Sequence, residues 1–173
     1  MKQKFIVAIL MLCFPFLCMN ADDHEGNTYE TAERLFHIAR SANKNLVCYD
    51  VNLVDGKMDV KDPLKVYWVN REEHPGETNG LSFIQRKLAY GYKLVSSDQE
   101  SCTCTLTAYP ARQLTITRLG NTYVCLITIN NERAILQSLY VKANPKNPLS
   151  VEYVELRGVS VDNKQAVTER VKK

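Results

Sequence analysis

The sequence predicts a mainly β fold of the α+β class, in which about eight antiparallel strands form a small barrel or a sandwich. Apolar and polar residues alternate through most of the chain after Leu46, which is the period of a half-buried strand. Tight-turn signals such as Asp55-Gly56 and Gly120-Asn121 separate these runs, and tight turns join antiparallel neighbours. Closure into a barrel is favoured over an open meander because it pairs the two edge strands.

The first expected element is an N-terminal amphipathic helix. Asn27 can cap it, and it is expected to run from about residue 28 to residues 43–45. Its apolar positions recur every three or four residues, so they form one stripe that faces the core. These positions are Tyr29, Ala32, Leu35, Phe36, Ala39 and Ala42.

Two strands, a loop and a second helix are expected next. Residues 46–53 and 65–70 have strand periodicity, and the polar segment 70–80 contains a Pro-Gly break that excludes a regular element. A short helix should follow, with Thr78 or Asn79 as its cap and Gly91 as its end. Its apolar face is formed by Leu81, Ile84 and Leu88.

The remainder of the chain is expected to be strand after strand, joined mostly by tight turns. Pro110, Gly120-Asn121 and the 144–148 loop separate the runs. The expected strands span residues 92–96, 102–108, 114–118, 123–129, 134–141 and 151–161.

The N-terminus has the pattern of a secretory signal peptide. Lys2 and Lys4 precede an uncharged apolar run over residues 5–17, which is too short to span a bilayer. We expect residues 1–21 to be removed by cleavage after Ala21, which gives an exported protein of the periplasm or cell surface. Cys18 leaves a second possibility open, a lipid anchor, and this is the one membrane attachment that the sequence suggests.

The mature chain is expected to be one domain. Residues 22–27 form a flexible tether, residues 28–163 the mainly β domain, and residues 164–173 a flexible tail. Without Lys2 and Lys4 the chain has 20 basic residues against 19 acidic ones, so its net charge is about +1. This balance and the lack of a basic stripe argue against a nucleic-acid partner.

Four cysteines remain after removal of the signal peptide, and their redox state is open. In an oxidising compartment they could form up to two disulfides, and a bridge from Cys125 to Cys102 or Cys104 is sterically easier than one within the Cys-x-Cys pair. The alternative is that they are buried free thiols. The cysteines concerned are Cys48, Cys102, Cys104 and Cys125, and their spacing is a weak metal signal.

The densest group of chemically active side chains lies in the 70–80 loop. Carboxylates beside an imidazole can bind a metal or share a proton, but the spacing matches no known metal or catalytic motif. An interaction loop is the commoner role for such a segment. The candidate residues are Arg71, Glu72, Glu73, His74 and Glu77.

Three function classes therefore stay open. The first is a non-catalytic envelope module that binds a small molecule or a protein partner, because the sequence has no nucleophile elbow, phosphate loop or dinucleotide fingerprint and implies no cofactor. The second is a hydrolase or metal-dependent enzyme that uses Glu72, Glu73, His74 and Glu77. The third is a structural envelope protein, which a large exposed apolar patch would favour.

Two segments resemble a domain-of-unknown-function family of exported bacterial proteins, found especially among Bacteroidetes. They are Tyr67-Trp68-Val69-Asn70-Arg71-Glu72-Glu73 and the run from Leu81 to Tyr92, in which Leu88-Ala89-Tyr90-Gly91 is the most specific part. The resemblance extends from about Thr31 to Val161. It implies export and an envelope setting in a bacterium with two membranes, and it assigns no activity and no functional residue.

Overall fold

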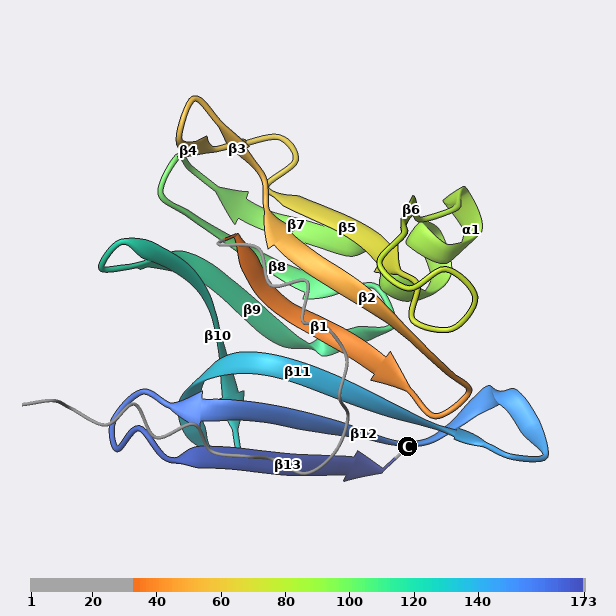
Figure 1. Ribbon diagram of the computed structural model, residues 1–173. Coiled ribbons are helices and arrows are strands. Elements are labelled where there is room, and N and C mark those ends of the chain that lie inside the picture. The colour runs from red at the N-terminus through yellow and green to blue at the C-terminus, as the bar shows by residue number, and fades with distance from the viewer. Residues whose placement is uncertain (1–32, 173) are drawn as a thin grey trace, which may run out of the picture.

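A computed structural model describes residues 33–172, and for residues 148 and 149 it describes the backbone without the side chains. Within this range the chain is mainly strand, as predicted, and the sheets curl into a half-barrel (Figure 1). No helix among these residues is long and apolar enough to cross a membrane. The strands are β1 (Arg34–Arg40), β2 (Asn43–Val51), β3 (Leu53–Val54), β4 (Lys57–Met58), β5 (Leu64–Val69), β6 (Thr78–Gly80), β7 (Tyr92–Ser97), β8 (Ser101–Leu106), β9 (Tyr109–Leu119), β10 (Thr122–Ile129), β11 (Glu132–Asn144), β12 (Asn147–Ser160) and β13 (Ala166–Lys172).

The long strand β11 is the branch point of the sheet. One of its edges pairs with β12 along nearly its whole length. The other edge pairs first with β10, over residues 132–135, and then with β1, over residues 138–141. Two arms therefore leave the same edge of β11: β1-β2-β5-β6 and β10-β9-β8-β7. The strands β12 and β13 continue the sheet from the opposite edge.

The core lies where the two arms curl toward each other. Tyr49 of β2 stacks on Phe36 of β1 with ring centroids 4.4 Å apart, and both rings are fully buried. They pack in one cluster with Ile116 of β9, Leu136 of β11 and Leu156 of β12. The burial of this apolar surface is the main force that holds the half-barrel closed on itself.

The predicted N-terminal helix is wrong over the described residues, because Arg34–Arg40 is strand β1. Residues 28–32 lie outside the described residues. The register with β2 shifts between Arg34 and Phe36, so Leu35 is the extra residue of a β-bulge, and both it and Phe36 are buried. This bulge places two consecutive apolar residues in the core, which imitates the spacing of a helical stripe.

The expectation of purely antiparallel neighbours also fails at one place, since β1 pairs with β11 in parallel. The two strands are far apart in sequence, so no tight turn joins them and local turn signals cannot reveal the pairing. The eight strands predicted from alternation are all present in the structure. The additional ones are the short β3, β4 and β6, and two strands in the segments predicted as helix and tail.

The tail predicted over residues 164–173 is instead strand β13, which spans Ala166–Lys172 and pairs with β12. Val167 and Val171 pack against the core cluster. Between them, Glu169 accepts hydrogen bonds from the Arg112 guanidinium of β9 and from Asn130 N, the latter at 2.7 Å. Glu169 shares one face of β13 with Val167 and Val171, and its charge is paired there, so the charged residues of this segment belong to a strand and do not mark a frayed end.

A short helical segment after the 70–80 loop is confirmed, although its cap and its buried face differ from the prediction. Helix α1 (Phe83–Gln85) continues as one π-helical turn, Arg86–Tyr90. Its cap is Ser82: the Ser82 hydroxyl accepts from Gln85 N at 3.2 Å and the Gln85 side chain accepts from Ser82 N at 2.9 Å. Leu81 and Tyr90 are buried, whereas Ile84 and Leu88 are about two-thirds exposed.

Candidate functional site

The half-barrel leaves an open seam between β5 and β7, the two strands at which the curled arms approach each other (Figure 1). The Tyr92 side chain of β7 spans this seam. Its hydroxyl accepts a hydrogen bond from Leu64 N of β5 at 3.3 Å and donates one to Asp62 Oδ1 at 2.5 Å. At the seam, hydrogen bonds of a side chain therefore link β7 to β5 and to the loop before it, whereas backbone hydrogen bonds link neighbouring strands elsewhere in the sheet.

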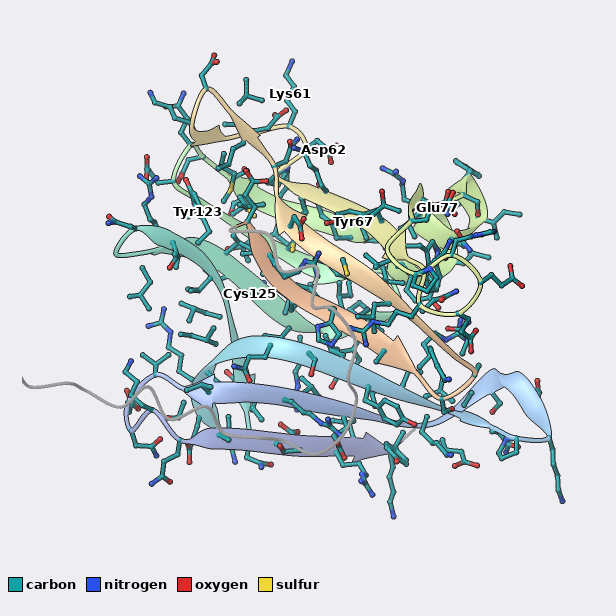
Figure 2. All side chains as sticks on the ribbon, in the orientation of Figure 1. Lys61, Asp62, Tyr67, Glu77, Tyr123 and Cys125 are labelled. Carbon is teal, nitrogen blue, oxygen red and sulfur yellow. The ribbon has the colours of Figure 1, made fainter. Side chains whose placement is uncertain are left out.

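A half-open pocket of about 250 Å³ lies at the seam, which we call the seam pocket. This volume is slightly below the roughly 300–1,000 Å³ that is typical of small-molecule sites, so the pocket suits a small ligand or part of a larger one. Figure 2 shows Lys61 and Asp62 on the loop that leads into β5. The pocket is lined by Lys61, Asp62, Val66, Arg86, Gly91, Tyr92 and Leu94.

The loop on one side of the seam pocket is fixed by its own hydrogen bonds. Asp59 Oδ1 accepts from Lys61 N at 2.8 Å and from Asp62 N at 3.3 Å, which closes a local turn. Asn52 then holds the loop against β2, because its side-chain amide donates to Asp62 O at 2.7 Å and its N–H donates to Pro63 O at 2.8 Å. Lys61 and Asp62 are therefore presented from an ordered backbone.

The helical segment forms the other wall. Tyr90 is buried, and its carbonyl accepts a hydrogen bond from the Tyr49 hydroxyl at 2.7 Å, which ties the end of the segment to the core. Gly91 follows at a position where a Cβ atom would lie 2.0 Å from Arg86 O. Because residue 91 has no side chain, the chain can pass close to the Arg86 carbonyl as it leaves the helical segment for β7.

The seam pocket combines charged and apolar surface. Lys61 and Arg86 are exposed, and neither side chain has an ion pair within residues 33–172, whereas the Asp62 carboxylate accepts from Tyr92. Burial, together with this hydrogen bond, raises the pKa of Tyr92 above its usual value, so the phenol stays protonated and remains a donor to Asp62. Two positive side chains beside Val66 and Leu94 suit a ligand that has an anionic group and an apolar body.

The 70–80 loop does not gather its candidate side chains. Backbone hydrogen bonds close it: Gly76 N donates to Asn70 O and Asn70 N to Glu77 O, both at 2.9 Å. Among the residues of the described range, no group of three or more His, Cys, Asp and Glu side chains could hold a metal ion. The side chains of Glu72, Glu73, His74 and Glu77 are exposed, and Arg71 is partly buried.

The four cysteines are buried free thiols in the structure. Cys102 of β8 and Cys125 of β10 both lie opposite Ile116 of β9, so they are two strand spacings apart. That is about 9.6 Å between Cα atoms, beyond the roughly 7 Å that a disulfide tolerates. Burial raises the thiol pKa to about 11 for Cys48 and Cys102, and to about 12 for Cys104.

Sequence reasoning missed the residues of the seam pocket. Arg86 falls within the expected short helix, and Val66 and Leu94 fall within expected strands, so none of the three is predicted as a site residue. No local pattern marks these residues, because the pocket exists only where the ends of the two arms meet. One signal in the sequence does point to this place. Leu88-Ala89-Tyr90-Gly91 is the most specific part of the family resemblance, and its glycine lines the pocket.

Comparison with known proteins gives a family and no activity. No curated protein matches the chain, and no solved structure does. A family model described as "Domain of unknown function (DUF4833)" matches residues 36–170, which is most of the chain and nearly all of the described half-barrel. The family resemblance suggested by the sequence is thereby confirmed, and the chain belongs to the DUF4833 family.

Proposed function

We propose that this protein is a non-catalytic binding module that takes a small amphipathic anion in the seam pocket. The observation that carries the proposal is the lining of this pocket, where Lys61 and Arg86 stand beside Val66 and Leu94. The cationic groups would hold the anionic end of the ligand, and the apolar residues would cover its body. The ordered loop and the anchored helical segment keep these groups in place before the ligand arrives.

The enzymatic alternative has less support. It requires Glu72, Glu73, His74 and Glu77 to converge in a concave site, and these side chains are instead exposed on a closed turn. The seam pocket contains one carboxylate, Asp62, which is engaged by the Tyr92 hydroxyl. This arrangement favours recognition over proton transfer.

A protein partner is the second candidate, and a specific surface favours it. Phe83, Ile84 and Leu88 of the helical segment are 76%, 67% and 68% exposed, and the Lys87 ammonium lies 5.7 Å from the centroid of the Phe83 ring. Neighbouring exposed apolar side chains on one short segment are typical of contact surfaces. We call these three residues the helix patch.

Binding of anilinonaphthalene sulfonate (ANS) tests the proposal, because this fluorophore has an apolar ring system and one anionic group. The double variant Lys61→Gln/Arg86→Gln should weaken ANS binding about tenfold, since both positive partners of the sulfonate are lost. Lys65→Gln is the matched control: Lys65 is an exposed lysine on β5 beside Val66, on the opposite face of the strand. The readout is the dissociation constant from a fluorescence titration.

Two results would reject the seam pocket. One is equal ANS affinity in the wild type, the double variant and the control. The other is loss of ANS binding in Phe83→Ser/Leu88→Ser together with full binding in Lys61→Gln/Arg86→Gln. That second pattern would transfer the binding role to the helix patch.

We also propose that the module works after export, in the periplasm or at the cell surface. The support is the pattern of Lys2, Lys4 and the apolar run 5–17, which lie outside the described residues. The N-terminal residue of the protein recovered from the envelope fraction should be Asp22. Fatty-acid labelling at Cys18 would instead establish the lipid-anchored form, and a cytoplasmic protein that retains residues 1–21 would contradict export.

A further inference from the structure

Strand β2 is buried on both of its faces. Val47 and Tyr49 point into the main core cluster. The residues that alternate with them are Leu46, Cys48 and Asp50, and these are 8%, 0% and 4% exposed. One face of an antiparallel sheet is commonly solvated when the other face packs on the core. We call the face of β1, β2 and β5 that points away from the main core the outer face.

A second apolar cluster lies on the outer face. Leu46, Cys48 and Val69 form its centre, and Val69 is 2% exposed. Ala39 and Tyr67 pack against them, and Tyr67 is labelled in Figure 2. All five residues belong to the neighbouring strands β1, β2 and β5, so one layer supplies the whole cluster. Within residues 33–172, no apolar side chain from a second layer belongs to it.

Strands β8 and β9 show how a solvated side looks in the same molecule. Cys102 and Cys104 of β8 point into the main core, and Thr103 and Thr105, which alternate with them, are partly exposed. Thr115 of β9, which lies opposite Thr103, is also partly exposed. These strands are buried on one side, and on the other side they are polar and partly open. The burial of apolar residues on both sides of β2 therefore indicates that the outer face is covered.

Basic side chains surround the apolar cluster on the same side of the sheet. On β11, β12 and β13 the outward positions alternate with core residues such as Leu139, Leu156 and Val171. The one carboxylate at these outward positions, Glu155, accepts hydrogen bonds from two arginines, each at 2.7 Å. The lysines have no ion pair with any residue of the described range. The basic residues are Lys44 of β2, Lys65 of β5, Lys142 of β11, Arg157 of β12, and Arg170 and Lys172 of β13.

The eleven residues that precede the described range carry the opposite charge. Residues 22–32 have four acidic side chains and no lysine or arginine, whereas residues 33–172 have 19 lysines and arginines against 15 acidic residues. The segment also has one large apolar ring, that of Tyr29. Its charge and its aromatic residue therefore complement a face that is apolar at its centre and basic around it. The acidic residues are Asp22, Asp23, Glu25 and Glu30.

The segment joins the domain beside this face and is long enough to cross it. Val51 N donates to Glu33 O at 2.9 Å, which fixes Glu33 at the end of β2. Eleven extended residues can span about 36 Å. The far end of β1 is about 23 Å from Glu33, and β13 lies three strand spacings, or about 14 Å, from β1. Both distances are within the reach of the segment.

We propose that residues 22–32 bind across the outer face as a strap and form the layer that covers it. Tyr29 is four residues from Glu33, and so is His37, which pairs with Cys48. A segment that turns back at Glu33 therefore brings the Tyr29 ring level with the apolar cluster. The acidic residues at its start then reach the basic side chains of β12 and β13. The part of the segment that the sequence suggests is a flexible tether would thus have a fixed position on the domain.

Alkylation of the four free thiols by iodoacetamide tests the strap in the mature protein, with mass spectrometry to assign each modified cysteine. Cys48 lies under the proposed strap, whereas Cys102, Cys104 and Cys125 lie in the main core and serve as internal references. Tyr29→Ser should accelerate alkylation of Cys48 about tenfold, because local opening of the strap no longer costs the apolar contact. The three reference thiols should keep their rates.

A second pair of variants tests the charge complementarity. Glu25→Gln/Glu30→Gln should also accelerate alkylation of Cys48, and added salt should do the same in the wild type because it screens the attraction. The matched control is Asp55→Asn/Glu100→Gln, which removes two exposed carboxylates from turns elsewhere in the chain. This control should leave the Cys48 rate unchanged.

Three results would overturn the strap. The first is an unchanged Cys48 rate in Tyr29→Ser. The second is an equal acceleration of all four thiols, which would show that the variant destabilises the whole fold. The third is a Cys48 rate that falls as the protein concentration rises, which would assign the cover to a second copy of the chain. None of these measurements uses ANS, so the strap and the seam pocket succeed or fail separately.

Discussion

Gly91 shows how one residue connects the helical segment to the seam. Its backbone angles are φ −71° and ψ 176°, which any residue can adopt, so its requirement for glycine is steric. A Cβ atom there would lie 2.0 Å from Arg86 O, a backbone atom that cannot rotate away. Any larger residue must move the π-helical turn, which is held in the core through Tyr90.

Gly91→Ala should therefore destabilise the protein by about 2 kcal/mol, as is usual when a well-packed site is overfilled. Urea denaturation followed by circular dichroism measures the change in the free energy of unfolding. Gly80→Ala is the matched control, because a Cβ atom there has no neighbour within 4 Å and its change should stay within about 0.5 kcal/mol. Equal stabilities of the two variants would refute the steric role of Gly91.

Individual side-chain roles were the least predictable part of the molecule. The sequence shows four cysteines suited to burial, and the structure places them as free buried thiols, one of the two alternatives that the sequence left open. It cannot show that Ile116 separates Cys102 from Cys125, since that follows from strand register. The same holds for Asp62 and Tyr92, which are 30 positions apart and meet only across the seam.

At the scale of elements, β13 is the clearest case of a segment that tertiary contacts stabilise. Arg112 of β9 binds both carboxylate oxygens of Glu169, and Asn130 N donates to the same carboxylate. The hydrogen bond from the Arg112 guanidinium, the largest cause, lowers the pKa of Glu169. The stabilisation is thus present above the pKa of the unfolded chain and is lost as the pH falls through the lowered folded value.

Glu169→Gln should lower the free energy of unfolding at pH 7 by about 1 kcal/mol, since a charge-assisted bidentate contact is replaced by a neutral one. The difference from wild type should shrink toward zero as the pH is lowered past the pKa of Glu169. Denaturant titrations at a series of pH values measure it. Glu152→Gln, on the exposed surface of β12, should show no such pH dependence, and a pH-independent effect of Glu169→Gln would contradict the ion pair.

Element prediction succeeded where alternation is regular and failed where another signal imitates or hides it. Eight of the strands after residue 46 follow from their alternating pattern, because one face of such a strand packs in the core. In β1 the bulge at Leu35 breaks the alternation and imitates a helix. In β13 the charges of Glu169 and Arg170 suggest a solvated tail, although both are paired in the folded protein.

At the scale of the whole molecule, residues 33–172 form neither a closed barrel nor a flat sandwich, because β11 divides one of its edges between β10 and β1. The mainly β class and the curled shape follow from the strand content and from the tendency of long sheets to protect their edges. The branch point does not follow, since it depends on a parallel pairing between distant segments. The seam, and with it the pocket, is a consequence of that branch.

The assignment of binding to the seam is tested most directly by a ¹H–¹⁵N correlation spectrum of the labelled protein, recorded during titration with ANS. The largest shifts are expected at the backbone amides of Lys61, Val66, Arg86, Gly91 and Leu94. Shifts confined to Phe83, Ile84 and Leu88, or shifts scattered over the surface without saturation, would contradict a binding site at the seam.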